Sequence, residues 1–175
     1  KNKNKYLDGL SGIAVNTLGH NHRGLVKAIS KQASKLIHVS NYYYIEEQSV
    51  LADKLVKLSK LSSVFFCNSG CEAAIKLARL HGHKLGIDSP NIIVMEGGFH
   101  GRTMGTLSAS GGRKYQAGFE PLMSGYIRVP FDEIGAIEKI ASKKNKVSAI
   151  FVEPIQGEGG VNIPFNFKQY LRKLR

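Results

Sequence analysis

Short apolar runs alternate with longer helix-patterned segments, and this alternation is the feature that most constrains the fold of the chain. Residues 92–96 and 147–153 are apolar at most positions, as expected of strands buried on both faces. Further strands are predicted at 64–67 and 126–129, and apolar residues at three- and four-residue spacing predict helices at 23–38, 46–60, 69–85, 133–141 and 167–175. Buried strands separated by helices predict an α/β fold with a mostly parallel sheet flanked by helices.

Polar and glycine-rich motifs follow the predicted strands. Ser69-Gly70 follows the strand at 64–67, Phe99-His100 opens a glycine-rich loop at 97–112, and Glu153-Pro154 follows the strand at 147–153. Ligands bind outside the carboxyl ends of the strands in parallel sheets. Three such loops converging on one edge therefore predict a binding site there.

The segment Asn68-Ser69-Gly70-Cys71-Glu72-Ala73 joins an apolar run to a predicted helix. The free N–H groups and the positive dipole end of a helix N-terminus attract anions, and Ser69 can both cap the helix and donate to a phosphate. Two interpretations stay open on these residues alone: an anion site and an ordinary capped helix.

Other candidate side chains lie in the loops. Phe99 can stack on a flat cofactor or cover the core, and Arg102 offers a planar fork for a carboxylate or a surface ion pair. His100 can be an acid, a base or a structural group. Glu153 follows a buried strand, so its carboxylate must be paired or functional. The spacing of Glu153 and Glu158 does not make them an acid/base pair.

No metal site is expected from the spacing of histidines and cysteines. His20 and His22 have no third ligand at matching spacing, so we expect a turn before the helix that begins near Arg23. Cys67 and Cys71 lack metal-ligand partners as well, so we expect reduced thiols in a cytosol-like compartment.

The formal net charge of +12 raises the alternative of nucleic-acid binding. The lysines are scattered along helical segments, with one small cluster at Lys143, Lys144 and Lys146, and no nucleic-acid-binding motif is present. Lysine-rich solvated helix faces are therefore the favoured interpretation. We expect no nucleic-acid partner and no membrane partner, because no apolar run could span a bilayer and the basic N-terminus is no signal peptide.

Taken together, the motifs resemble the class III, fold-type I pyridoxal-phosphate (PLP) aminotransferases, most similarly their acetylornithine branch, over essentially the whole chain. The resemblance is carried by the segments at residues 6–16, 18–22, 40–41, 65–70, 99–103, 114–116 and 153–160. It implies that the chain is part of the large PLP-binding domain of such an enzyme.

The resemblance implies roles at the cofactor. The segment Ser69-Gly70-Cys71 would hold the PLP phosphate, Phe99 would stack on the pyridine ring, and Glu153 would be an anchor beside the cofactor.

It also implies roles toward the substrate. Arg102 would bind the α-carboxylate. Glu158 would pair with an arginine later in the chain, in a contact that opens and closes to admit a basic and a dicarboxylic substrate in turn.

The implied reaction is transamination of N-acetylornithine with 2-oxoglutarate, giving N-acetylglutamate semialdehyde and glutamate in arginine biosynthesis. A cytoplasmic homodimer is implied as well. Transamination of succinyl-diaminopimelate, ornithine or 4-aminobutyrate stays open, as does a non-catalytic remnant. His100 in place of a tryptophan favours the acetylornithine branch over ornithine δ-aminotransferases.

Two of the sequence's departures from the family bear directly on the cofactor. About three residues common in relatives are missing after Ala73, and no lysine matches the family's Schiff-base lysine, which lies beyond Arg175. We therefore expect an N-terminal segment at 1–20, an incomplete large domain at 21–175, and no catalysis or good solubility of this piece alone.

Overall fold

The computed structural model describes residues 3–142 and 146–175. The chain divides into two compact units, Lys1–Val64 and Phe65–Arg175 (unit one and unit two below). Lys143 and Lys144 of the basic cluster lie outside the described residues. No helix in the described part of the chain has both the length and the apolar content needed to cross a bilayer.

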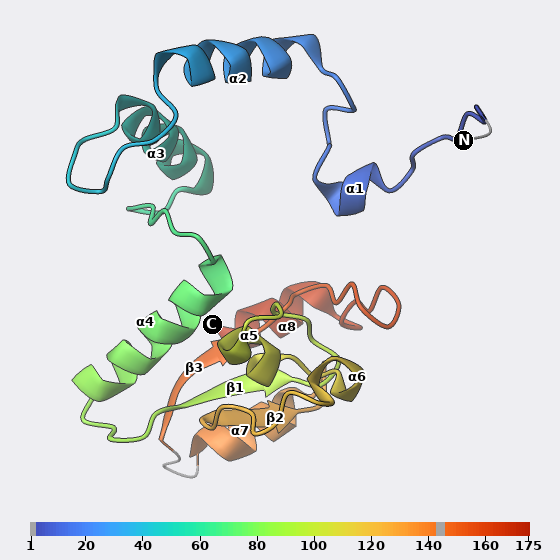
Figure 1. Cartoon of the computed structure of the whole chain (residues 1–175). Coiled ribbons are helices and arrows are strands. Elements are labelled where there is room, and N and C mark those ends of the chain that lie inside the picture. The colour runs from blue at the N-terminus through green and yellow to red at the C-terminus, as the bar shows by residue number, and fades with distance from the viewer. Residues whose placement is uncertain (1–2, 143–145) are drawn as a thin grey trace. The chain divides into compact units, whose positions relative to one another are not determined.

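Unit one is helical. It contains α1 (Ser11–Ala14), α2 (Arg23–Lys35) and α3 (Glu46–Ser59) (Figure 1). The two longer helices confirm those predicted at 23–38 and 46–60 apart from their last residues. His22 is the N-cap of α2, with its Nδ1 accepting the N–H of Leu25 at 3.3 Å, which confirms the predicted turn before this helix.

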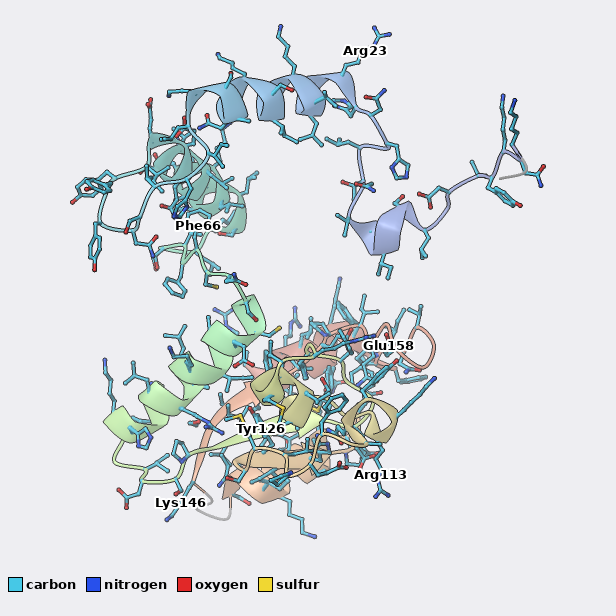
Figure 2. The ribbon with its side chains drawn as sticks, viewed as in Figure 1. Arg23, Phe66, Arg113, Tyr126, Lys146 and Glu158 are labelled. Carbon is cyan, nitrogen blue, oxygen red and sulfur yellow. The ribbon has the colours of Figure 1, made fainter. Side chains whose placement is uncertain are left out.

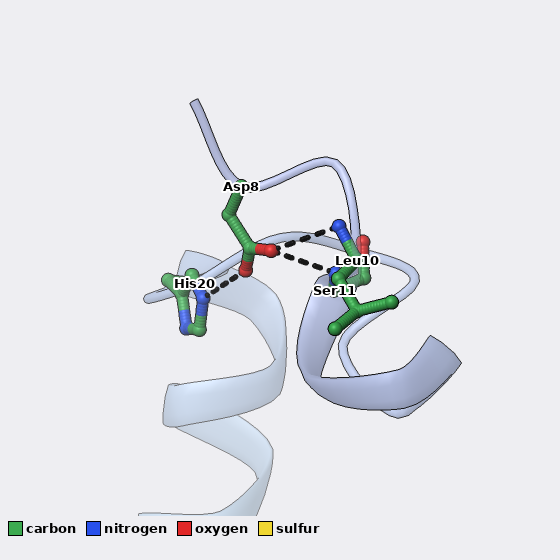
Figure 3. Close-up of polar contacts among 4 residues, drawn as sticks. All are labelled: Asp8, Leu10, Ser11 and His20. Atoms are coloured by element: carbon green, nitrogen blue, oxygen red, sulfur yellow. Dashed lines mark hydrogen bonds and ion pairs between the residues drawn. The ribbon is translucent and has the colours of Figure 1, made fainter. Parts of the chain in front are cut away.

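Asp8 organises the segment that precedes these helices (Figure 3). Its Oδ1 accepts the N–H groups of Leu10 and Ser11 at 3.0 and 2.8 Å, and its Oδ2 lies 2.9 Å from Nε2 of His20. The hydrogen bond with His20, followed by those from the backbone, lowers the pKa of Asp8. His20 and His22 therefore have separate local roles.

Unit two contains a three-stranded sheet built from β1 (Asn91–Met95), β2 (Tyr126–Val129) and β3 (Val147–Phe151). Its order is β2-β1-β3, and both pairings are parallel, with Ile93 opposite Ile127 and Ile150. The predicted parallel sheet is confirmed.

Helices cover both faces of this sheet (Figure 1). Ile92 and Val94 pack with residues of α4 (Gly70–Lys84) and α5 (Met104–Ala109). Ile93 and Met95 point to the other face, toward α7 (Ile134–Ser142) and α8 (Phe167–Leu174). Alternate β1 side chains thus fill two cores, as a strand inside an α/β/α sandwich requires.

Two predictions about local structure are wrong. Residues 64–67 form no strand with any described residue, because a strand needs a hydrogen-bonding neighbour and none lies beside them. Phe65 is accordingly 71% exposed. The glycine-rich loop at 97–112 is also not a loop throughout, since α5 lies within it and α6 (Arg113–Gln116) follows it.

Close backbone contact fixes this glycine-rich segment against the end of β1. The N–H of Gly111 donates to the carbonyl of Gly98 at 2.8 Å, and a Cβ at Gly111 would overlap the backbone nitrogen of Gly97. Only glycine allows this approach. The segment between β1 and α5 is thereby held at the carboxyl end of the sheet.

Candidate functional site

The N-terminus of α4 has the features of an anion site. Ser69 is the N-cap, and its Oγ accepts the N–H of Glu72 at 3.5 Å. Among the described residues, nothing accepts the N–H groups of Gly70 and Cys71. Apart from its chain neighbours and the backbone of its own helix, no atom lies within 4 Å of where a Gly70 Cβ would be. Burial raises the pKa of the Cys71 thiol, so it stays neutral at pH 7 and adds no negative charge.

A cavity of about 600 Å³ opens beside this helix end. Asn68, Ser69 and Glu72 contribute polar groups to its wall, and Phe65 and Leu77 contribute apolar ones. Free N–H groups, a capping hydroxyl and an adjacent cavity favour the anion-site interpretation over an ordinary capped helix.

Glu72 joins the first turn of α4 to the segment that carries the other candidate residues. Its Oε1 accepts the Thr103 hydroxyl and, at 3.2 Å, the N–H of Thr106. A Cβ at Gly105 would lie 2.7 Å from Oε2 of Glu72, so glycine is what allows the carboxylate to approach α5. Glu72 had no predicted role, because its partners lie more than 30 residues away.

Glu153 lies just beyond the carboxyl end of β3 and holds two loops. Its Oε2 accepts the N–H of Phe99 at 3.0 Å, and its Oε1 accepts the N–H of Gly157 at 3.1 Å. Buried Gln156 adds a bond from Nε2 to the carbonyl of Glu96 at 2.8 Å. The loop after β3 is thus tied to the loop after β1.

Tyr115 in α6 is the centre of a second group. Its ring meets the Phe99 ring edge-on, with centroids 6.0 Å apart, and the Cζ of Arg102 lies 5.5 Å from its centroid. Its hydroxyl donates to Oε2 of Glu158 at 2.7 Å, and this bond raises the pKa of Tyr115. The structure therefore brings three of the predicted site residues together around a tyrosine that had no predicted role.

Glu158 lies in a turn after β3 (Figure 2). Arg102 and Tyr115 come from the segment after β1. Tyr115 was noticed in the sequence only as part of the motif at 114–116. Nothing local predicts its contacts, because Glu158 is 43 residues away.

His100 is buried behind these groups. Its ring stacks on Phe151 with centroids 4.2 Å apart, and its backbone N–H donates to Oγ of Ser110 at 2.9 Å. Its Nε2 is buried and has no hydrogen-bond partner among the described residues. Burial lowers the pKa of His100, which favours the neutral ring. The contacts therefore give His100 a packing role.

Known proteins match the chain along its whole length. The family model for class-III aminotransferases matches residues 1–175. The acetylornithine aminotransferase of Nitrosomonas europaea is 58% identical over 175 residues, which cover 98% of this chain and 44% of that protein.

Two solved structures are similar as well. The ornithine aminotransferase of Toxoplasma gondii has a TM-score of 0.88 at 30% identity, covering 98% of this chain and 41% of that one. The acetylornithine aminotransferase of Elizabethkingia anophelis has a TM-score of 0.73 at 36% identity, covering 94% and 41%. The chain spans less than half the length of these relatives. Its fold is that of the fold-type I PLP-dependent enzymes, and the chain belongs to the class-III aminotransferases.

Proposed function

We propose that residues 1–175 form the N-terminal part of a PLP-dependent aminotransferase that transfers an amino group from N-acetylornithine to 2-oxoglutarate. The products are N-acetylglutamate semialdehyde and glutamate, a step of arginine biosynthesis. The observation that carries the proposal is the link that Glu72 makes, through Thr103 and Thr106, between the unpaired N-terminus of α4 and the segment after β1 that contains Phe99 and Arg102. The shared name of the relatives supports the choice of substrate.

The residues present fit PLP. A phosphate dianion suits the unpaired N–H groups of Gly70 and Cys71 and the Ser69 cap, where the helix dipole is positive. Phe99 is half-buried and follows β1, so an aromatic ring lies at the carboxyl end of the sheet. When bound, PLP supplies an electron sink for carbanion chemistry.

The chain's own groups bind and orient. Arg102 is exposed, and in the described structure its guanidinium forms no ion pair, so its donors are available for the α-carboxylate of the substrate. Glu153 sets the position of Phe99 through its backbone N–H. We propose that Glu158 admits basic and dicarboxylic substrates in turn by pairing with an arginine outside residues 1–175.

The lysine that transfers the proton in the family has no counterpart among residues 1–175. No lysine in residues 1–175 matches the family's catalytic position, so we propose that these residues alone do not transaminate. In this proposal residues 1–20 lead into the large domain, residues 21–175 are part of it, and the complete enzyme is a cytoplasmic homodimer without nucleic-acid partners.

The test is the cofactor absorbance of the complete enzyme before and after addition of N-acetylornithine. We expect the bound cofactor spectrum to change and 2-oxoglutarate to reverse the change. Arg102→Leu should lower kcat/KM about 100-fold, since a charged bidentate contact contributes about 3 kcal/mol. Arg113→Leu, an exposed arginine of α6, is the matched control.

Other spectral outcomes would correct the proposal. A spectrum that responds only to ornithine, 4-aminobutyrate or succinyl-diaminopimelate would keep the reaction and change the substrate. Failure to bind PLP at all would favour a non-catalytic remnant.

A further inference from the structure

We infer that Tyr115 is a positioning residue that keeps the carboxylate of Glu158 away from the guanidinium of Arg102, so that the Arg102 fork stays available to a substrate carboxylate. The inference rests on the proposed function, in which Arg102 binds that carboxylate. It assigns to Tyr115 a role in specificity for carboxylate substrates.

The contacts carry the inference. One side of Tyr115 is used by Arg102, whose Cζ lies 5.5 Å from the ring centroid, and the hydroxyl is used by Oε2 of Glu158 at 2.7 Å. Arg102 and Glu158 have opposite charges and share this neighbour, yet the described structure contains no ion pair between them. The tyrosine therefore separates two groups that would otherwise attract each other.

Competition explains why the separation matters. A carboxylate binds an arginine fork through two parallel N–H bonds, and the Glu158 carboxylate would occupy the donors that a substrate needs. The neutral Tyr115 hydroxyl gives Glu158 a hydrogen bond without using those donors. The ring meanwhile attracts the guanidinium through its face and leaves the edge of the fork free.

Three features fix the position of the Tyr115 ring. Buried Gln116 anchors α6 by donating from Nε2 to the carbonyls of Leu107 and Ser110 at 3.0 and 2.7 Å. The Phe99 ring contacts the Tyr115 ring in a T-shaped arrangement. Gly112 leaves room, because a Cβ there would lie 2.8 Å from Cδ2 of the Tyr115 ring.

The first experiment compares KM and kcat of the complete enzyme across variants. Tyr115→Leu should raise KM for 2-oxoglutarate about 10-fold with kcat little changed, a size typical of coupled neighbouring groups. Tyr115→Phe removes the hydrogen bond to Glu158 but keeps the ring. Its KM for 2-oxoglutarate should lie between the values of wild type and Tyr115→Leu. Gly112→Ala should raise KM by about as much as Tyr115→Phe, because the new Cβ displaces the Tyr115 ring.

Two comparisons separate this role from simple packing. In an enzyme that already carries Glu158→Gln, adding Tyr115→Leu should raise KM for 2-oxoglutarate much less than 10-fold, because the competing charge is gone. Tyr126→Phe is the matched control, since Tyr126 also has an arginine over its ring and donates its hydroxyl, to the carbonyl of Gly105. An equal loss of affinity with and without Glu158→Gln would overturn the inference.

A second readout needs no turnover. With ¹³C-labelled tyrosine in the cofactor-free enzyme, the Tyr115 resonance is assigned by its loss in Tyr115→Phe. Glu158→Gln should shift its titration to lower pH, since the Glu158 bond is the main cause of the raised pKa. If the titration of Tyr115 is the same in wild type and Glu158→Gln, the inference is contradicted. A wild-type enzyme that accepts no carboxylate substrate would instead overturn the proposed function.

Discussion

Both units contain helices that apolar spacing in the sequence predicts, but the two units differ in what those helices bury. Helices α2 and α3 of unit one have apolar stripes, and His22 caps α2, yet neither helix buries a residue. In unit two, alternate side chains of β1 fill two cores on opposite faces of a sheet. Local signals thus suffice to form helices, whereas burial needs strands brought together from distant parts of the chain.

The exposure of isoleucines shows the size of the difference. Ile93 of β1 is 0% exposed and Ile29 of α2 is 59% exposed. Burying an isoleucine fully contributes about 1.5 to 3 kcal/mol relative to leaving it exposed. Unit two therefore has a source of stability that unit one lacks by itself.

The largest predicted effect would come from emptying the core of unit two. Ile93→Ala should destabilise unit two by about 4 kcal/mol, because it leaves a cavity among packed side chains. Ile29→Ala should change stability by less than about 0.5 kcal/mol. Denaturant unfolding is monitored by the amide protection of β1 for Ile93→Ala and by that of α2 for Ile29→Ala. Equal effects of the two substitutions would break the comparison between the units.

Backbone contact gives the next largest effect. Gly111→Ala should destabilise unit two by about 3 kcal/mol, since the new Cβ would overlap the backbone at Gly97. Gly135→Ala is the control, because Gly135 lies in α7 with open space around it and should gain about 0.5 kcal/mol of helix stability. The same unfolding experiment applies. A harmless Gly111→Ala would show that the loop after β1 is not fixed as described.

The smallest predicted effect is that of replacing His100 on how the stability of unit two depends on pH. Burial lowers the pKa of His100, with Arg128 adding to the shift and Glu153 opposing it. The unfolded chain therefore binds a proton below about pH 6.5 that folded His100 resists. The stability that neutral His100 contributes is complete above that pH and is lost as the pH falls through the folded pKa.

Replacing His100 tests this linkage. In His100→Phe, which keeps a ring to stack on Phe151, stability should fall less steeply between pH 6.5 and the folded pKa. Exposed His38 in unit one provides the control variant His38→Phe. The explanation fails if wild type and His100→Phe lose stability equally as the pH is lowered.

Most helices and three strands followed from the sequence alone. Apolar spacing, the cap at Ser69 and the turn expected before Arg23 place two helix starts within one residue, because these signals act within a single turn. The alternation of apolar runs and helices predicted a parallel sheet because only helices on both faces can bury such strands. Residues 64–67 show the limit, since an apolar run becomes a strand only where a partner lies beside it.

The candidate site divides in the same way. The sequence by itself determined which residue types could bind an anion, a flat ring and a carboxylate: Ser69, Phe99 and Arg102. Only the tertiary structure decided that Tyr115 contacts both Arg102 and Glu158 and that Glu72 joins α4 to α5. Capping and periodicity depend on neighbours in the chain, whereas these contacts join residues 13 to 43 positions apart that only the folded sheet brings together.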